Sequence, residues 1–268
     1  HQIINFLSRG DHLDGVLTSI ERGLAFVRKT RFQDVESILL IQRHYVEHLR
    51  TPADTLWRAD DVFPDDLLPP VSPQAPERLS TLGFWFGLYR AMAHFACGDY
   101  AQAAQRLEQA GTLAWSAPGH IHLLDFHFYS ALSLSLQLTP ETFSAEYRRR
   151  IHQHYDKIAL WARVNPGTFA DKEALVYAEI VRLDGMNSIA LEQYERAITL
   201  SRDAGFTPYH ALAHELAGRF ARSCGYTTTA DAHYRGAIAA WGRAGAQAKV
   251  RQLEQAFPHL LTPTQASA

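Results

Sequence analysis

Apolar residues recur along most of the chain at spacings of three and four, which is the period of one face of an α-helix. Strict alternation of apolar and polar residues, the pattern of a half-buried strand, is rare. Most prolines fall between the helical segments, where they end helices. The pattern therefore predicts an all-α protein.

One long segment breaks the helical pattern, because five prolines and several acidic residues lie between Asp60 and Glu77. On its N-terminal side, Leu13–Lys29 and Phe32–Leu49 predict a helix pair. We expect residues 1–50 to form the N-terminal helices of a solenoid and residues 51–83 to form a proline-rich irregular connection. Residues 84–261 are expected to form helical repeats, and residues 262–268 a polar linker tail.

The strongest pattern is an internal repeat of small and bulky residues. Three segments share a glycine, an alanine five residues later, a bulky residue four further on, and an alanine three after that. The three sets are Gly98, Ala103, Leu107 and Ala110; Gly185, Ala190, Tyr194 and Ala197; and Gly225, Ala230, Tyr234 and Ala237. A small residue also stands seven positions before each glycine, at Ala91, Ala178 and Gly218. The glycine ends one helix, small residues let two helices approach, and the bulky residue fills the gap to the next pair.

This spacing is typical of tetratricopeptide (TPR) repeats, in which antiparallel helix pairs stack side by side. Repeat starts fall at Phe84, Asp171 and Ala211, and a weaker unit fits at Leu124, with its second helix displaced by a loop around Pro140. The starts lie about 40 residues apart, against about 34 in a usual TPR, so the pairs are lengthened. Because no pair buries its apolar face alone, we expect an all-α, right-handed α-solenoid of antiparallel, TPR-like helix pairs.

Charge and composition exclude several function classes. The formal net charge of −2 argues against general nucleic-acid binding, which requires a positive surface. The run Arg148–Arg150 is interpreted as a solvated helix face, with a docking patch as the alternative. Neither a membrane span nor a signal peptide is visible in the sequence, so we expect a cytoplasmic protein without a membrane partner. The chain begins with His1, and we expect it to be a piece of a longer polypeptide.

Several runs of sequence carry a family resemblance. They are YAEIVRLDG (Tyr177–Gly185), AITLSRDAGF (Ala197–Phe206), HALAHELAGRF (His210–Phe220) and GAQAKVRQLEQAFPHLL (Gly245–Leu261), with ERGLAFVRKTRF (Glu21–Phe32) and NPGTF (Asn165–Phe169) upstream. In order and spacing they resemble the TPR-like helical region that follows the AAA-like, STAND-type ATPase module of large bacterial and fungal signalling proteins. Those proteins include sensor histidine kinases and serine/threonine-kinase-like proteins.

The resemblance implies a helical region beside an ATPase module and carries over no catalytic residue. It departs before the last run, where the family's Tyr and Trp correspond to Trp241 and Ala244, so we expect the last helix to pack differently. The chain itself has no GxxxxGK[ST] phosphate loop, no HRD-type catalytic loop and no GxGxxG after a strand. We therefore expect no enzymatic activity and no cofactor in this chain, within a parent protein that is a kinase or ATPase.

Histidines and cysteines offer weaker candidates for chemistry. His210 and His214 stand four apart on a predicted helix and could share a metal ion, but the HExxH arrangement and an evident third ligand are missing. Packing histidines are the preferred interpretation, and no metal site is assigned. Cys97 and Cys224 fall at predicted helix C-termini, where the helix dipole disfavours a thiolate, so we interpret them as free packing thiols.

A binding groove is the better-motivated hypothesis, because the first helices of TPR pairs line an inner groove. The corresponding positions of the first two units are Trp85, Leu88, Met92, Phe95, Asp125, Phe128, Leu132 and Ser135. Those of the last two units are Lys172, Leu175, Glu179, Arg182, Leu212, Glu215, Arg219 and Arg222. The first set is mainly apolar, so we expect the helices of Leu13–Leu49 to cover it, with an open groove for a partner helix or ligand as the alternative. The second set is expected to form a polar groove or a solvated face.

The preferred function is a regulatory and protein-interaction module that senses a partner or small ligand and controls the adjacent ATPase of a signalling protein. The alternative is a TPR-type effector-binding or adaptor region of a transcription regulator or scaffold, which would have the same fold. A metal-dependent enzyme on a helical bundle is the weakest hypothesis.

Overall fold

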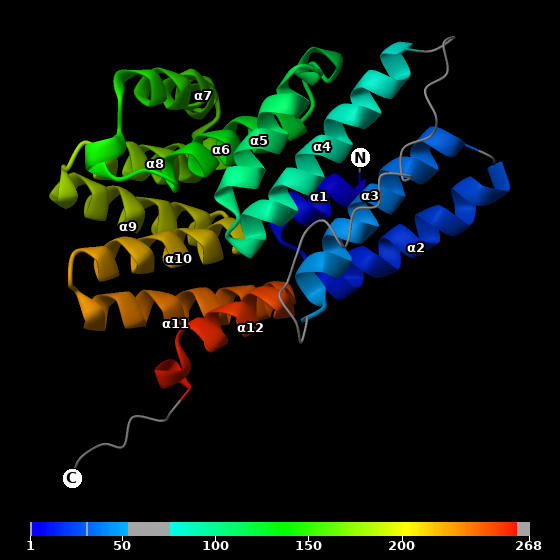
Figure 1. Ribbon diagram of the computed structural model, residues 1–268. Coiled ribbons are helices and arrows are strands. Elements are labelled where there is room, and N and C mark those ends of the chain that lie inside the picture. The colour runs from blue at the N-terminus through cyan, green and yellow to red at the C-terminus, as the bar shows by residue number, and fades with distance from the viewer. Residues whose placement is uncertain (1, 31, 53–75, 262–268) are drawn as a thin grey trace.

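A computed structural model confirms the predicted all-α solenoid. It describes residues 2–30, 32–52 and 76–261, and these ranges form helices without a strand (Figure 1). The helices are α1 (Gln2–Arg9), α2 (Leu13–Thr30), α3 (Gln33–Arg50), α4 (Pro76–Cys97), α5 (Tyr100–Gly111), α6 (His122–Ser135), α7 (Ala145–Val164), α8 (Pro166–Leu183), α9 (Asn187–Asp203), α10 (Thr207–Ser223), α11 (Thr227–Ala244) and α12 (Gln247–Ala256). The predicted tail, residues 262–268, and residues 53–75 of the predicted connection lie outside the described residues.

Antiparallel pairs follow one another around the molecule, from α2–α3 through α4–α5, α6–α7 and α8–α9 to α10–α11 (Figure 1). Each pair packs against the next, and α12 adds a half pair at the end. The loop around Pro140 forms a short 3₁₀ turn before α7, as the displaced second helix of that unit requires. In the described part of the chain, no helix is both long and apolar enough to cross a membrane.

The repeat residues lie where the helices approach each other most closely. Gly98, Gly185 and Gly225 end the first helices of their pairs with φ angles of 86°, 74° and 81°, a conformation that favours glycine. The repeat alanines are buried between helices, from Ala91 and Ala103 to Ala230 and Ala237. A Cβ atom on Gly218 would lie 3.0 Å from the Tyr234 ring, so the small residue makes room for the bulky one of the next helix.

The structure differs from the sequence-based boundaries at two places. Helix α4 begins at Pro76, so the C-terminal part of the predicted 51–83 connection is helical. Proline is favoured in the first turn of a helix, where its missing N–H would have had no partner. In addition, α1 precedes the predicted first pair, because Ile3, Ile4, Phe6 and Leu7 give a short amphipathic helix that ends at Gly10.

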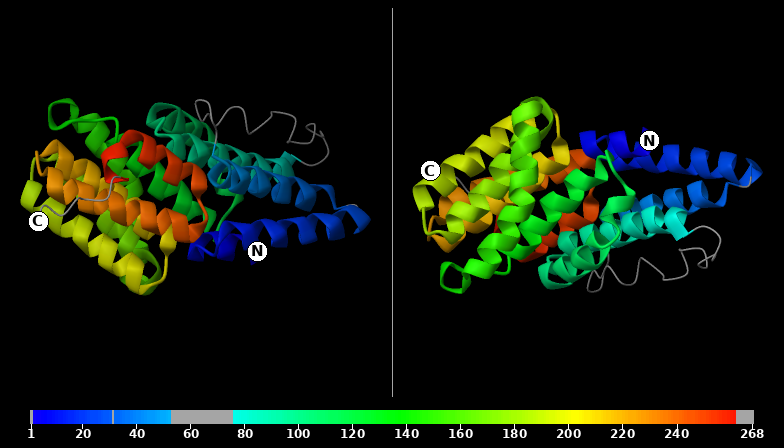
Figure 2. Two further views of the ribbon diagram at one scale, coloured as in Figure 1. Left: turned by 90° about the horizontal axis from the view of Figure 1, so that it is seen from below. Right: turned by 90° about the horizontal axis from the view of Figure 1, so that it is seen from above.

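The two ends of the solenoid meet. Helix α12 contacts α3, and α1 contacts α10, so the N-terminal helices lie against the C-terminal ones in both views of Figure 2. At the second contact, Gly10 lies so close to Pro208 that a Cβ atom on it would be 2.2 Å from the proline Cδ. The inner face is therefore enclosed by the chain's own helices.

Candidate binding site on the inner face

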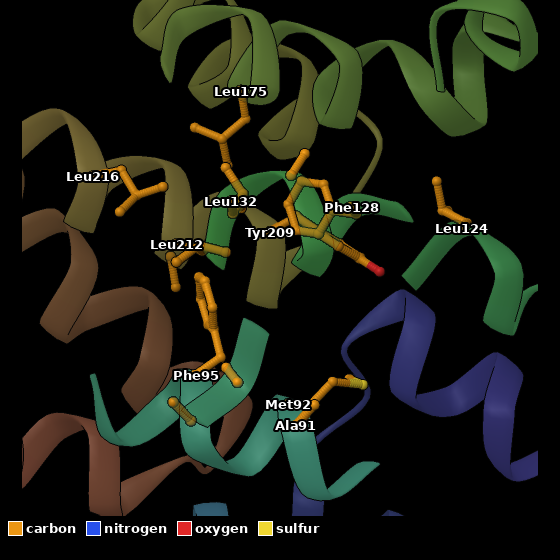
Figure 3. Packing of buried hydrophobic residues seen from close by; sticks show 14 of the residues in the cluster. Ala91, Met92, Phe95, Leu124, Phe128, Leu132, Leu175, Tyr209, Leu212 and Leu216 are labelled. Carbon is orange, nitrogen blue, oxygen red and sulfur yellow. The ribbon is translucent and has the colours of Figure 1, made fainter. Parts of the chain in front are cut away.

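The apolar half of the predicted groove is core. Trp85, Leu88, Met92, Phe95 and Phe128 are each at most 8% exposed. Figure 3 shows three of them, Met92, Phe95 and Phe128, among the buried side chains at the centre of the molecule. The alternative of an open apolar groove is wrong, because α3 packs beside α4 as the neighbouring pair, and Ile4 and Leu7 of α1 line the same cavity as Met92.

Arginines of the second half bind the carbonyl groups at the end of α6. Arg182 donates hydrogen bonds to the backbone oxygens of Ser135 (2.9 Å) and Leu138 (3.3 Å), and Arg219 donates to that of Leu136 (3.0 Å). The last carbonyls of a helix have no partner within the helix and carry partial negative charge. These two arginines thus tie α8 and α10 to the end of α6.

A buried acid holds Arg182 in place. Glu179 is 1% exposed, and it accepts hydrogen bonds from Arg182 (2.7 Å) and from the hydroxyl of Tyr194 (2.5 Å). Each member of the group therefore has a partner of opposite charge or polarity. The expected polar groove is filled here by charges that satisfy one another.

A second group joins the C-terminal helix to the start of the repeats. Lys249 Nζ donates to Glu215 Oε1 (2.8 Å) and to the backbone oxygen of Ala96 at the end of α4 (3.2 Å). The Trp241 indole donates to the other oxygen of Glu215 (3.1 Å). Gln252 adds a hydrogen bond to the Cys97 carbonyl (3.0 Å). Among the predicted groove cations, Arg219 and Arg222 stay exposed, and the Arg222 guanidinium lies 5.2 Å from the Phe257 ring centre.

The other half of the inner face contains a cavity of about 60 Å³ between α1, α3, α4, α6, α10 and α11. Its polar lining comes from Ser8, Asp11 and Asp125 and from a set of tyrosines: Tyr45, Tyr89, Tyr129 and Tyr209. Its apolar lining includes Ile4 and Leu7 of α1, Met92 of α4, and the Trp241 side chain. Because a water molecule needs about 10–15 Å³ of such space, the cavity has room for about four to six water-sized groups.

Two acids line the cavity: Asp11 is partly exposed and pairs with Arg9, whereas Asp125 is buried, with 9% exposure. Oδ1 of Asp125 accepts a hydrogen bond of 2.9 Å from the Tyr209 hydroxyl, and no other described residue donates to the carboxylate. Burial raises the pKa of Asp125 to about 6, while the Tyr209 hydrogen bond and the Lys172 charge act in the opposite direction. Burial and the nearby carboxylate raise the pKa of Tyr209 well above its ordinary value.

Lys172, a predicted groove residue, lies against the ring of Tyr209 and is not among the residues that line the cavity. Its Nζ is 4.0 Å from the centre of that ring and 3.6 Å from the centre of Phe206. It donates to the Thr168 carbonyl (3.1 Å) and lies 3.1 Å from Asp171 Oδ2. Burial lowers the pKa of Lys172 and raises that of Asp171, while their mutual attraction opposes both shifts. A cation that is surrounded in this way is part of the core.

Histidines form partly buried pairs with each other and with aromatic rings. His127 and His154 approach to 2.9 Å between their Nδ1 atoms, and His214 and His233 to 3.2 Å. Burial lowers the pKa of His127 to about 3 and that of His154 to about 4, so both are neutral at pH 7. Within the described ranges, no three His, Cys, Asp or Glu side chains gather as a metal site would require. Cys97 and Cys224, at the ends of α4 and α10, form no disulfide in the described part of the chain, and Cys97 Sγ lies 3.4 Å from His48 Nε2.

The groove positions include Asp125 but miss most of the cavity. The tyrosines come from four helices, and only contact between these helices brings the rings together. The clearest missed signal is the apolar stretch before Gly10, which becomes α1 and closes the cavity.

The sequence matches no protein-family model and no curated protein.

Proposed function

We propose that this chain is a non-catalytic regulatory and protein-interaction module of a multidomain signal-transduction ATPase or kinase. It senses a partner or small ligand on its enclosed inner face and controls the adjacent ATPase module. The observation that carries the proposal is the closure of the solenoid around a cavity by α1 and α12. A closed ring of helix pairs has a second, open arrangement available, and a ligand that prefers one of the two shifts their populations.

The runs that resemble the signalling family contribute the residues of this closure. Glu215 belongs to HALAHELAGRF and Lys249 to GAQAKVRQLEQAFPHLL, and these two side chains bind each other across the ring. Glu179 and Arg182 belong to YAEIVRLDG and hold the end of α6. The link from closure to an ATPase rests on this resemblance and is an argument by analogy. We place the module in the cytoplasm, since cysteines that form no disulfide in the described part of the chain suit a reducing compartment.

The test is a combined X-ray and light-scattering measurement of this chain, alone and with the segment that precedes it in its parent polypeptide. We expect a monomer that binds the preceding segment. The double variant Glu215→Gln/Lys249→Met removes the closing pair without leaving an unpaired charge, so it should expand the particle and weaken this binding. Lys157→Met, on the exposed face of α7, is the matched control and should change neither property.

Three results would contradict the proposal. Tight self-association of the chain, or indifference to the preceding segment, would favour the free-standing adaptor. Equal binding of the preceding segment by the original chain and by the Glu215→Gln/Lys249→Met variant would show that this binding does not depend on closure of the solenoid. The proposed means of control would then be lost.

A further inference from the structure

The cavity beside α1 combines a buried carboxylate with aromatic walls. We propose that it binds a small alkylammonium ion, with Asp125 as the counter-ion and the tyrosines around it as the cage. The inference deepens the proposed function, since it names the class of ligand that the module senses.

Charge balance in this part of the core is the first argument. Three ionisable side chains are buried together around Tyr209: Asp125 (9% exposed), Asp171 (4%) and Lys172 (2%). Lys172 lies 3.1 Å from Asp171, and with both acids ionised the group carries one excess negative charge. A buried charge without a partner is costly, so the site favours either a proton or a cationic ligand beside Asp125.

The hydrogen bonding of Asp125 also favours a cationic ligand beside it. Among the described residues only Tyr209 donates to it, although a carboxylate has room for several donors. By contrast, Glu179 and Glu215 on the same inner face each accept hydrogen bonds from a cation and from an aromatic residue. Asp125 therefore has a free acceptor position, and it lines a cavity of about 60 Å³.

The walls favour an ammonium ion with alkyl groups over a bare metal ion. Aromatic rings attract cations through their negative faces, and cages of such rings bind methylated ammonium groups. Tyr45 and Tyr89 lie 5.3 Å apart between ring centres, and they line the cavity together with Tyr129 and Tyr209. Ile4, Leu7 and Met92 offer apolar contacts for the alkyl groups. The volume suits a ligand of about four or five non-hydrogen atoms.

Helix α1 provides a way in and out. It carries Ile4 and Leu7 of the cavity wall, and Ser8 and Asp11 at its C-terminal end line the cavity while being partly exposed. Movement of this eight-residue helix would open the cavity without disturbing the helix pairs. A bound ammonium ion would hold α1 closed, and this couples the ligand to the closure of the solenoid.

The test is calorimetric titration of the whole chain with trimethylammonium, tetramethylammonium and neutral tert-butanol, which have similar size. We expect saturable 1:1 binding of at least one ammonium ion and weaker or no binding of the alcohol. Asp125→Asn should weaken the ammonium affinity by about tenfold or more, because it removes the counter-ion. Asp203→Asn, on the exposed end of α9, should leave the affinity unchanged.

A second variant protects the test against misfolding. Ala246→Leu extends an apolar side chain into the cavity from its wall and should also abolish binding, with helical content checked by circular dichroism. Absence of saturable ammonium binding, equal affinity for tert-butanol, or unchanged affinity in Asp125→Asn would overturn the inference. Ammonium binding without any effect on docking of the preceding segment would instead leave the inference standing and contradict the proposed function.

Discussion

The two halves of the inner face use buried charge in different ways. In the C-terminal half, Glu179 and Glu215 are paired with Arg182 and Lys249, and these cations also bind the carbonyls at the ends of α6 and α4. In the N-terminal half, Asp125 keeps one hydrogen bond beside a cavity. Fully satisfied charges lock a structure, while an incompletely satisfied acid beside a cavity is a place for a ligand. We therefore propose closure as the role of the C-terminal half and ligand sensing as the role of the N-terminal half.

The largest expected effect comes from acid, which should destabilise both halves and the N-terminal half more strongly. Burial lowers the pKa to about 4 for His48, about 3 for His122 and His127, and about 4 for His154, all in α3–α7. In α10 and α11, burial lowers the pKa of His214 to about 4 and also lowers the pKa values of His210 and His233. Below the unfolded value of about 6.5, the unfolded chain binds protons that the folded chain does not, so stability is lost as pH falls. At pH 5.5 this costs about 1 kcal/mol per histidine relative to pH 7.5.

Urea unfolding at pH 7.5 and pH 5.5 measures this loss, and hydrogen exchange locates it. Asp125 acts in the opposite direction, because its raised pKa of about 6 means that the folded chain takes up a proton before the unfolded one. Asp125→Asn should therefore make the acid-induced loss steeper. A loss of protection in α8–α11 as large as that in α3–α7 would contradict this order.

A second prediction breaks the locked half. Glu215→Ala leaves Lys249 buried without its acid and should lower the free energy of unfolding by about 3 kcal/mol. Glu192→Ala, on the exposed surface of α9, is the control and should change it by less than about 0.5 kcal/mol. Denaturant unfolding at pH 7.5 compares the two. A loss in Glu215→Ala as small as that of the control would mean that the pair does not close the ring.

A third prediction compares the two halves by removing one tyrosine hydroxyl from each. Tyr209→Phe removes the hydrogen bond of Asp125 and leaves the buried acid without a donor from the described residues, at a cost of about 2 kcal/mol. Tyr194→Phe removes a hydrogen bond from Glu179, which keeps Arg182, and should cost about 1 kcal/mol. Thermal or urea unfolding of both variants tests the order. The reverse order would show that Asp125 is better satisfied than Glu179.

The smallest expected effect concerns the contact that holds α1 against α10. Gly10 has a φ of 80° and abuts Pro208, so Gly10→Ala should cost about 1–2 kcal/mol and detach α1. Gly15→Ala, on α2 with open space around the new methyl group, should stabilise the chain by about 0.5–1 kcal/mol. Hydrogen exchange of α1 and the helix pairs distinguishes local from global effects. Equal exchange of α1 in both variants would argue against a movable lid.

The sequence by itself determined the helices and the way they pair. The repeat of Gly98, Ala103 and Ala110, and its copies further along, encodes the turn and the close approach because both depend on residue size and backbone freedom at fixed spacing. The limits of α2 and α3 agree with the predicted pair within about a residue, since their apolar period is regular.

Only the tertiary structure decided what the inner face does. The repeat spacing that identified Lys172, Arg182 and Glu215 as groove residues predicted which side of the helix they lie on. It did not predict which residues would lie against them once the two ends of the solenoid meet. Tyr45 and Tyr209 stand far apart in sequence and share a cavity because α1 and α12 close the ring. Periodicity fixes the face of a helix, whereas a cavity and its charge balance arise from non-local contacts between helices that no local pattern contains.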